Sequence, residues 1–220
     1  MDNFDVYSDI KARTNGEIYI GVVGPVRTGK STFIKRFMEL MVLPEMVDEH
    51  QKTQTRDELP QSAAGKTIMT TEPKFIPKEA AEIRLGDEIE AKVRLIDCVG
   101  FMVEGAAGHI ENDEERLVKT PWFEYEIPFT KAAEIGTRKV INDHSTIGVV
   151  ITTDGTIGEL KRPNYIAAEE RTITELKELG KPFIVLLNSV RPYSDETTAL
   201  AKDMSCLLYT SDAADDRISV

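Results

Sequence analysis

The sequence predicts an α/β protein in which a mainly parallel sheet lies between two layers of helices. Three observations predict this fold class. Short apolar, β-branched runs alternate with amphipathic helical patterns along the 220 residues. A glycine-rich loop joins the first of these runs to the first helical pattern. The composition, 41% hydrophobic and 30% charged, is that of a globular domain with its own core.

The first half of the chain predicts a strand, a loop and a helix, followed by two paired strands. Residues 17–23 form a short apolar run bounded by glycine, and apolar residues recur at helical spacing from 33 to 42. Residues 48–72 are polar and weakly patterned, which predicts a long loop. Residues 74–77 and 90–96 predict strands that pair antiparallel.

The second half alternates helices and strands more regularly. An insertion-like stretch reaches to about residue 129, and we then expect a helix at 130–144, a strand at 146–151, a helix at 163–179, a strand at 182–187 and a helical pattern from about 194. In such sheets, ligands bind beyond the carboxyl ends of the strands. On the helix at 163–179 we interpret four acidic residues as a solvated face: Glu169, Glu170, Glu175 and Glu178.

Charge and hydropathy exclude several classes of function. The formal net charge is −11, so the surface has no general attraction for nucleic acid or an anionic bilayer. No apolar run approaches the 18 residues of a membrane span, and the acidic start lacks the features of an export signal, which predicts a cytoplasmic location. The two cysteines, Cys98 and Cys206, form neither a disulfide framework nor a metal-ligand pattern, and Cys98 reads as a buried filler.

The end of the chain differs from the rest. From Cys206 onward the residues resemble translated sequencing-adapter read-through, and the change comes abruptly inside a helical pattern. We therefore predict a nucleotide-binding domain over residues 1–205, incomplete at its C-terminal end, and a non-native tail over residues 206–220. The natural protein would then continue beyond the sequence given.

Residues 24–31 carry the strongest functional signal. They read Gly-Pro-Val-Arg-Thr-Gly-Lys-Ser and fit the P-loop, or Walker A, pattern G-x-x-x-x-G-K-[ST] between a strand and a helix. In this motif backbone N–H groups and the helix N-terminus face phosphate oxygens, and the lysine reaches the β and γ phosphates. We predict a P-loop NTPase whose nucleotide is bound by Gly24, Pro25, Val26, Arg27, Thr28, Gly29, Lys30, Ser31 and Thr32.

A magnesium site is expected beside this loop. Ser31 offers a hydroxyl to Mg²⁺, and Asp97 stands at the carboxyl end of the strand before Cys98-Val99-Gly100. Asp97 can hold Mg²⁺, often through water, and the Gly100 N–H can bind the γ-phosphate. An Asp after a strand is also a common turn residue, so the motif gains its weight from the P-loop that precedes it.

Two threonines end the long polar loop. In nucleotide switches a threonine in this position binds Mg²⁺ through its hydroxyl and the γ-phosphate through its N–H. We predict this sensor role for Thr70 and Thr71, with Thr71 as a metal ligand and Thr67 as a competing position. Threonines are also common at the start of strands, which is the alternative reading.

The base-binding segment favours ATP. A guanine-specific site carries N-K-x-D after the strand that here ends at Leu187, but this chain has Asn188, Ser189, Val190 and Arg191. Arginine cannot accept the hydrogen bonds that guanine donates, whereas Asn188 can still touch the base. The residue after Gly100 is Phe101, where GTPases that orient their own attacking water commonly have Gln. We therefore expect slow hydrolysis by the monomer.

These residues resemble the stage IV sporulation protein A family, the morphogenetic ATPases of the spore coat in endospore-forming bacteria. The resemblance covers nearly all of residues 1–205 and is carried by residues 21–35, 57–75, 95–100, 132–140, 144–158 and 181–193. It implies a fold akin to translation-factor GTPases that binds ATP and Mg²⁺. It also implies that Lys30, the Thr70-Thr71 pair and Asp97 are the catalytic residues.

The resemblance further implies a place and partners. Hydrolysis would drive assembly of a static homopolymer, the coat basement layer, in the mother-cell cytosol on the forespore outer membrane surface. A small membrane-bound amphipathic peptide and other coat proteins would bind through regions outside this sequence. Two other functions remain open from the residues alone: a regulatory nucleotide switch, and a scaffold whose nucleotide is not hydrolysed.

Overall fold

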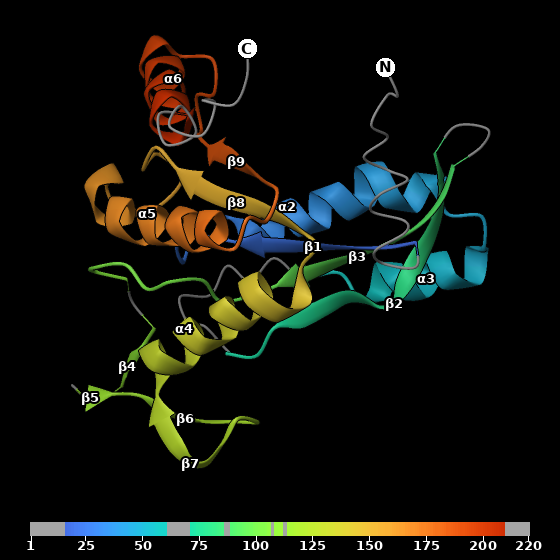
Figure 1. Ribbon diagram of the computed structural model, residues 1–220, viewed down its shortest axis with the longest axis horizontal. Helices are drawn as coiled ribbons and strands as arrows, with labels where there is room; N and C mark the ends of the chain where they lie inside the picture. The colour runs from blue at the N-terminus through green and yellow to red at the C-terminus, as the bar shows by residue number, and fades with distance from the viewer. Residues whose placement is uncertain (1–15, 61–70, 86–88, 107, 112–113, 210–220) are drawn as a thin grey trace, which may run out of the picture.

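The centre of the molecule is a five-stranded sheet (Figure 1). The computed structural model describes residues 16–60, 71–85, 89–106, 108–111 and 114–209. The strand order is β2-β3-β1-β8-β9, and only the β2–β3 pair is antiparallel. This confirms an α/β fold with a mainly parallel sheet, built from β1 (Glu17–Val23), β2 (Lys74–Leu85), β3 (Ile89–Asp97), β8 (Ile147–Thr153) and β9 (Phe183–Asn188).

The register of the parallel strands brings their carboxyl ends to one edge. Val22 of β1 pairs with Asp97, the last residue of β3, and Val23 pairs with Val150 of β8. Thr153 and Asn188 end β8 and β9 as a pair. The predicted P-loop, the segment after Asp97 and the base-binding segment therefore start from the same edge of the sheet, and the segment of Thr71 ends there, because Lys74 at the start of β2 pairs with Asp97.

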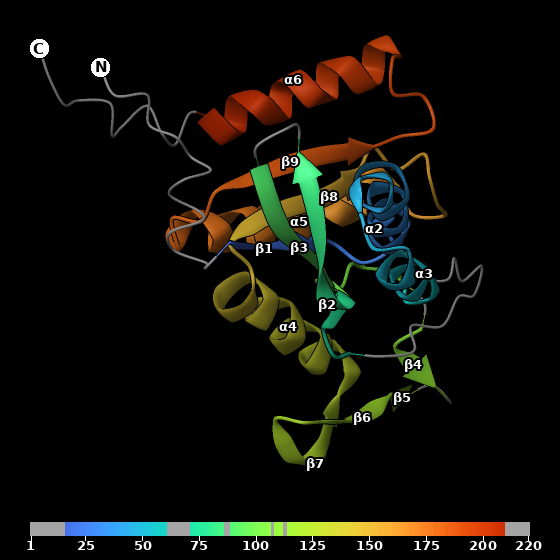
Figure 2. The ribbon, with the colours of Figure 1, turned by 90° about the vertical axis from the view of Figure 1, so that its right-hand side faces the viewer.

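Helices cover both faces of the sheet (Figure 2). On one face lie α2 (Lys30–Phe37), which continues through the turns Met38–Val42 and Leu43–Glu45, and α3 (Glu49–Asp57). On the other lie α4 (Phe129–Lys139), extended by Val140–His144, and α5 (Arg162–Glu178). The last helix, α6 (Asp195–Tyr209), runs along the β9 edge, and it contains the boundary predicted at residue 205, which stays a prediction.

The long loop predicted over residues 48–72 is wrong in its first part, which forms α3. Asp48 caps this helix, because its carboxylate accepts hydrogen bonds from the N–H groups of His50 and Gln51 at 2.8 and 3.2 Å. Thr55 of α3 is buried, and Leu59, which follows the helix, packs in the core on this face of the sheet. One buried residue in a short polar helix is too weak a pattern to predict. Residues 61–70 lie outside the described residues.

The stretch between β3 and α4 forms two small hairpins beside α4 (Figure 1). Their four strands are β4 (Ile110–Glu111), β5 (Glu114–Glu115), β6 (Leu117–Thr120) and β7 (Phe123–Pro128). They add nothing to the central sheet, as expected for an insertion. Within the described part of the chain, no helix has the length and apolar character needed to cross a membrane.

The solvated acidic face predicted on α5 is wrong for Glu169. This side chain is 5% exposed, and its carboxylate forms a two-bond ion pair with Arg162, at 2.6 and 2.7 Å. It also accepts a hydrogen bond from the Thr152 hydroxyl of β8. Glu169 is buried because it contacts Thr152 near the end of β8 and pairs with Arg162. The helical pattern of α5 does not indicate these contacts.

Candidate nucleotide-binding site

The site is built around the loop that joins β1 to α2, called here the glycine loop (residues 24–29). The loop passes close to two neighbours. A Cβ on Gly24, whose φ is +126°, would lie 2.4 Å from the Ile151 carbonyl oxygen of β8, so only glycine fits there. On its other side the Phe101 N–H donates to the Gly24 carbonyl at 3.2 Å, and the Val26 N–H donates to the Phe101 carbonyl at 2.9 Å. The loop is therefore held between the ends of β8 and β3.

The side chain of Lys30 turns back into the glycine loop. Its ammonium group donates to the Pro25 carbonyl at 2.5 Å and lies 3.5 Å from the Gly24 carbonyl. The residue is 5% exposed, and this burial lowers the pKa of Lys30, while the nearby Cys98 and Asp97 act in the opposite direction. A buried ammonium group held only by carbonyl dipoles is well suited to receive an anion.

The start of α2 also presents donors. The residue before the helix is Gly29, with a φ of +92°, and it has no side chain that could cap the first N–H groups. The loop before it is braced by two bonds. The Thr28 hydroxyl donates to the Pro25 carbonyl at 3.0 Å, and the side-chain amide of Asn188 donates to the Thr28 carbonyl at 3.0 Å.

Ser31 and Asp97 meet across 66 residues of sequence. The Ser31 hydroxyl donates to Oδ2 of Asp97 at 2.7 Å. The second oxygen, Oδ1, is buried and has no hydrogen-bond partner among the described residues. Burial raises the pKa of Asp97, although the hydrogen bond from Ser31 and the charge of Lys30 oppose this shift.

This pair fits a magnesium ion. Mg²⁺ prefers hard oxygen ligands and usually takes only one or two carboxylates from a protein, with phosphate and water oxygens completing its shell. Asp97 offers an oxygen without a partner, and Ser31 offers a hydroxyl beside it. Next to them, burial raises the pKa of the Cys98 thiol to about 11, which agrees with its prediction as an inert filler.

The predicted γ-phosphate contacts lie against α4. The Gly100 N–H donates to the Thr137 hydroxyl at 3.1 Å, and a Cβ on Gly100 would lie 2.6 Å from Nζ of Lys30. Thr71 is 5% exposed, and its carbonyl oxygen lies against Gly136. Thr70 and Thr67 lie outside the described residues, so the choice among the threonines stays a prediction.

The base-binding end contains a cluster that our sequence reasoning left without a role. Asp154 follows β8 and accepts hydrogen bonds from Thr156, through its N–H at 2.9 Å and its hydroxyl at 2.6 Å, and from the Thr197 hydroxyl of α6 at 3.1 Å. Burial alone would raise the pKa of Asp154, but hydrogen bonds from Ser189, Thr156 and Thr197 outweigh it and lower the pKa. The feature of the sequence that could have predicted this cluster is the polar run Thr152-Thr153-Asp154 at the end of a buried strand.

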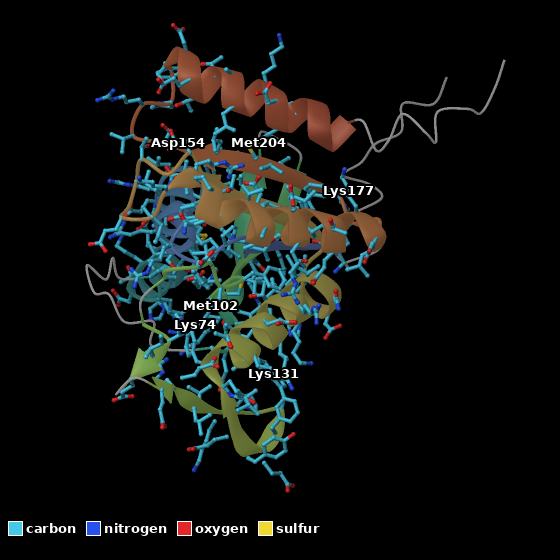
Figure 3. The ribbon with its side chains drawn as sticks, turned by 90° about the vertical axis from the view of Figure 1, so that its left-hand side faces the viewer. Lys74, Met102, Lys131, Asp154, Lys177 and Met204 are labelled. Carbon is cyan, nitrogen blue, oxygen red and sulfur yellow. The ribbon has the colours of Figure 1, made fainter. Side chains whose placement is uncertain are left out.

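Figure 3 shows Asp154 below α6, and Met204, a residue of α6, on the side of that helix that faces the sheet. Met204 contacts Arg162, whose guanidinium Nη2 lies 3.8 Å from the methionine sulfur. Arg191, at the position where guanine-specific sites have Asp, is exposed, and its N–H donates to the Ser189 hydroxyl at 2.9 Å. Asn188 braces the glycine loop in addition to any contact with a base.

The structure thus brings Lys30, Ser31, Asp97, Gly100 and Asn188 together at one edge of the sheet. A family model described as "Stage IV sporulation protein A, ATPase domain" matches residues 1–211. The chain belongs to this family. Proteins named stage IV sporulation protein A from Bacillus subtilis (strain 168), Bacillus anthracis and Clostridioides difficile (strain 630) are 60%, 58% and 56% identical to it, over 93%, 93% and 92% of its length. The resemblance inferred from the motifs is confirmed.

The chain spans 42%, 42% and 41% of the lengths of these three relatives. Among solved structures, a crystal structure of a mutation variant of SsGBP aligns with 91% of this chain and 48% of its own, at a TM-score of 0.43 and 17% sequence identity. The fold is defined by the sheet order and the strand, loop and helix unit described above. The family names support a role in sporulation and an ATPase domain.

Proposed function

We propose that this chain is the Mg²⁺-dependent ATPase domain of a spore coat protein, with a P-loop fold akin to translation-factor GTPases, and that its hydrolysis of ATP drives polymerisation. The observation that carries the proposal is the convergence of Lys30, Ser31 and Asp97 around the glycine loop. A buried ammonium, a hydroxyl and an unpartnered carboxylate oxygen at one helix N-terminus match the needs of a nucleoside triphosphate.

Each group of the proposed site has its own role in the binding and hydrolysis of ATP. The N–H groups of the glycine loop and Lys30 hold the β and γ phosphates, which aligns the terminal phosphoryl group for attack by water. Ser31 and Asp97 would hold Mg²⁺, with Thr71 as a further ligand, and the ion would neutralise charge on the phosphate oxygens. Thr70 or Thr71 and the Gly100 N–H contact the γ-phosphate. The leaving group is ADP.

The base contacts support ATP over GTP. Arg191 has only donors, so it cannot accept from guanine N1–H and N2–H₂, and Ser189 is too short to pack along a base as the usual lysine does. Phe101 is 2% exposed and its ring lies under the Arg171 guanidinium, at 4.5 Å. An apolar side chain buried in this way cannot orient the attacking water, which supports slow turnover by a monomer.

Assembly is the part of the proposal that reaches beyond this chain. Its relatives are more than twice as long, so polymer contacts, the membrane-bound amphipathic peptide and other coat proteins would engage regions that it does not span. The partner of the whole protein is then another copy of itself. Its location would be the mother-cell cytosol, on the outer membrane surface of the forespore.

The test uses a full-length relative and measures released phosphate and sedimentable polymer with ATP or GTP. We expect both signals with ATP and neither in the Lys30→Ala variant. Lys35→Ala is the matched control, because this lysine of α2 lies at the surface beside Glu39 and should change neither signal.

Two outcomes would support the other candidate functions. Polymer that forms equally without nucleotide would support a scaffold, and nucleotide binding without phosphate release or polymer would support a regulatory switch. A preference for GTP would overturn the base argument.

A further inference from the structure

Two adjacent residues of α4, Gly136 and Thr137, touch both segments that are proposed to sense the γ-phosphate. Thr137 contacts Gly100, which follows β3, and Gly136 contacts Thr71, which precedes β2. The two sensor segments are 29 residues apart in sequence and belong to different loops. One turn of one helix therefore holds both of them, and neither contact is part of the motifs that predicted the site.

The first contact uses the hydrogen of the Gly100 amide. Its N–H donates to the Thr137 hydroxyl oxygen at 3.1 Å, and both residues are buried. The Thr137 hydroxyl in turn donates to the Ala133 carbonyl one turn earlier, at 2.8 Å. The hydroxyl hydrogen is thus committed within α4, which leaves the oxygen as a fixed acceptor for Gly100.

The second contact is a close approach of two backbones. A Cβ on Gly136 would lie 2.5 Å from the Thr71 carbonyl oxygen and 3.3 Å from Cη2 of Trp122. Only glycine leaves room for Thr71 there. Side chains larger than hydrogen at residue 136 would push this segment away from α4.

The helix that makes both contacts is firmly attached to the core. Four of its side chains are fully buried: Phe129, Ala132, Ala133 and Thr137. Arg171 of α5 pairs with Glu134 of α4, and the same guanidinium covers the ring of Phe101. Arg138 of α4 pairs with Glu175 of α5 at 3.0 Å. The helix is therefore anchored to the core, and the two sensor segments can move relative to it.

The Gly100 N–H can make only one strong hydrogen bond. If it binds a γ-phosphate oxygen, it must leave Thr137, because the two acceptors belong to different groups. A charge-assisted bond to phosphate is stronger than a bond to a neutral hydroxyl, so ATP can drive this exchange. ADP has no γ-phosphate, and the amide then keeps its partner on α4.

We propose that Thr137 is a positioning residue that holds the Gly100 amide on α4 until a γ-phosphate replaces it, with Gly136 holding the Thr71 segment on the same helix turn. This inference rests on the proposed ATPase function and names the competitor of the γ-phosphate within the chain. If ATP binding releases both contacts, the surface of α4 changes. That surface would then differ between the ATP complex and the ADP complex.

The experiment measures the affinities of the full chain for ADP and for a non-hydrolysable ATP analogue, both with Mg²⁺, by calorimetry. Thr137→Val removes the acceptor but keeps the shape, so the free chain and the ADP complex both lose the bond, whereas the ATP complex had already given it up. ATP affinity should therefore rise while ADP affinity stays the same. We expect the ratio of ATP to ADP affinity to rise roughly fivefold, the equivalent of one neutral hydrogen bond. Thr137→Ser restores the hydroxyl and should restore the wild-type ratio.

Thr172→Val is the matched control. Thr172 is also fully buried in a helix, and its hydroxyl donates to the carbonyl of Ala168 four residues earlier at 2.7 Å. It repeats the intrahelical bond of Thr137 on α5, so its substitution should leave the ratio unchanged. A ratio raised equally by Thr172→Val or Thr137→Ser would overturn the proposal, because the effect would then come from packing.

A measurement on the unmodified chain covers the case in which Thr137→Val does not fold. We expect the amide resonances of Gly100 and Thr137 to shift between the ADP and ATP-analogue complexes, and that of Thr172 to stay. Binding of ATP with no such shift, or with an unchanged ratio in Thr137→Val, overturns this proposal alone. A chain that binds neither nucleotide overturns the proposed function and this proposal together.

Discussion

Two cations near the same edge of the sheet, the buried Lys30 and the partly buried Arg162, are satisfied in opposite ways. Arg162, at the start of α5, is held by both oxygens of the buried Glu169 and also contacts the end of β8. Lys30, at the start of α2, has no carboxylate within ion-pair distance among the described residues and donates to backbone carbonyls.

The difference separates a charge that is compensated within the protein from one that is not. A buried charge is stable when a partner of opposite charge compensates its lost hydration, as Glu169 does for Arg162. Lys30 lacks this compensation, and burial lowers its pKa. Its ammonium group is therefore available to an anionic ligand, whereas the Arg162–Glu169 pair is already neutralised within the protein.

The largest expected effect comes from removing the functional cation. Lys30→Ala should weaken ATP binding by roughly a hundredfold or more, about 3 kcal/mol, since a desolvated ammonium contact to phosphate is lost. The unfolding midpoint without nucleotide should stay the same or rise, because a buried charge is removed. Calorimetry and thermal unfolding would measure both, and a large loss of stability would place Lys30 with the structural charges.

Breaking the Arg162–Glu169 ion pair should lower stability and leave ATP binding unchanged, which is the reverse of the result expected for Lys30→Ala. Glu169→Ala leaves the partly buried Arg162 without its carboxylate partner, so we expect a loss of about 3 kcal/mol in the free energy of unfolding. The folded fraction should bind ATP as before. Denaturant unfolding measures the loss, and Glu170→Ala, at the neighbouring exposed position, is the control. Normal stability with lost nucleotide binding would break the comparison.

A smaller effect is expected where the glycine loop is braced. Asn188→Ala removes the hydrogen bond from the side-chain amide to the Thr28 carbonyl, which holds the loop around Lys30. ATP affinity should fall roughly fivefold, in line with about 1 kcal/mol for one neutral hydrogen bond. Asn142→Ala, an exposed position after α4, should leave the affinity unchanged. An unaltered affinity in Asn188→Ala would show that the loop does not need this brace.

The smallest effect concerns the pH dependence of stability. Burial raises the pKa of Asp97, so between the ordinary value of 3.8 and this raised pKa the folded chain binds more protons than the unfolded chain. The free energy of unfolding should therefore decrease as pH rises through that window. Denaturant unfolding at several pH values, compared with Asp97→Asn, isolates this contribution. A difference between the two proteins that grows with falling pH would contradict the assigned direction.

The sequence was sufficient to predict those parts of the fold and the candidate site that are formed by residues close together in the chain. The strand, glycine loop and helix around Lys30 were predictable because apolar runs, glycines and a helix start follow one another within some 25 residues. Asp97 and Gly100 were predictable because the end of a parallel strand places them at the ligand-binding edge. The antiparallel pair of β2 and β3 followed from two short runs close in sequence.

The misses share a physical cause. The helix α3 was not predicted because Thr55 is the one buried residue on its polar surface. Glu169 was assigned to solvent because nothing in the helical pattern of α5 indicates its ion pair with Arg162. In each case a long-range contact outweighs the local preference.

The sequence by itself determined the family and the fold class and was sufficient to predict candidate site residues, since these depend on short motifs whose backbone geometry is set by neighbouring residues. Only the tertiary structure decided which groups meet: the Ser31–Asp97 bond, the Asn188 brace and the contacts of Gly136 and Thr137 with the sensor segments. The physical reason is that hydrogen bonds and close backbone approaches act over about 3 Å, and the register of the strands and the packing of the helices against the sheet set those distances between residues far apart in the chain.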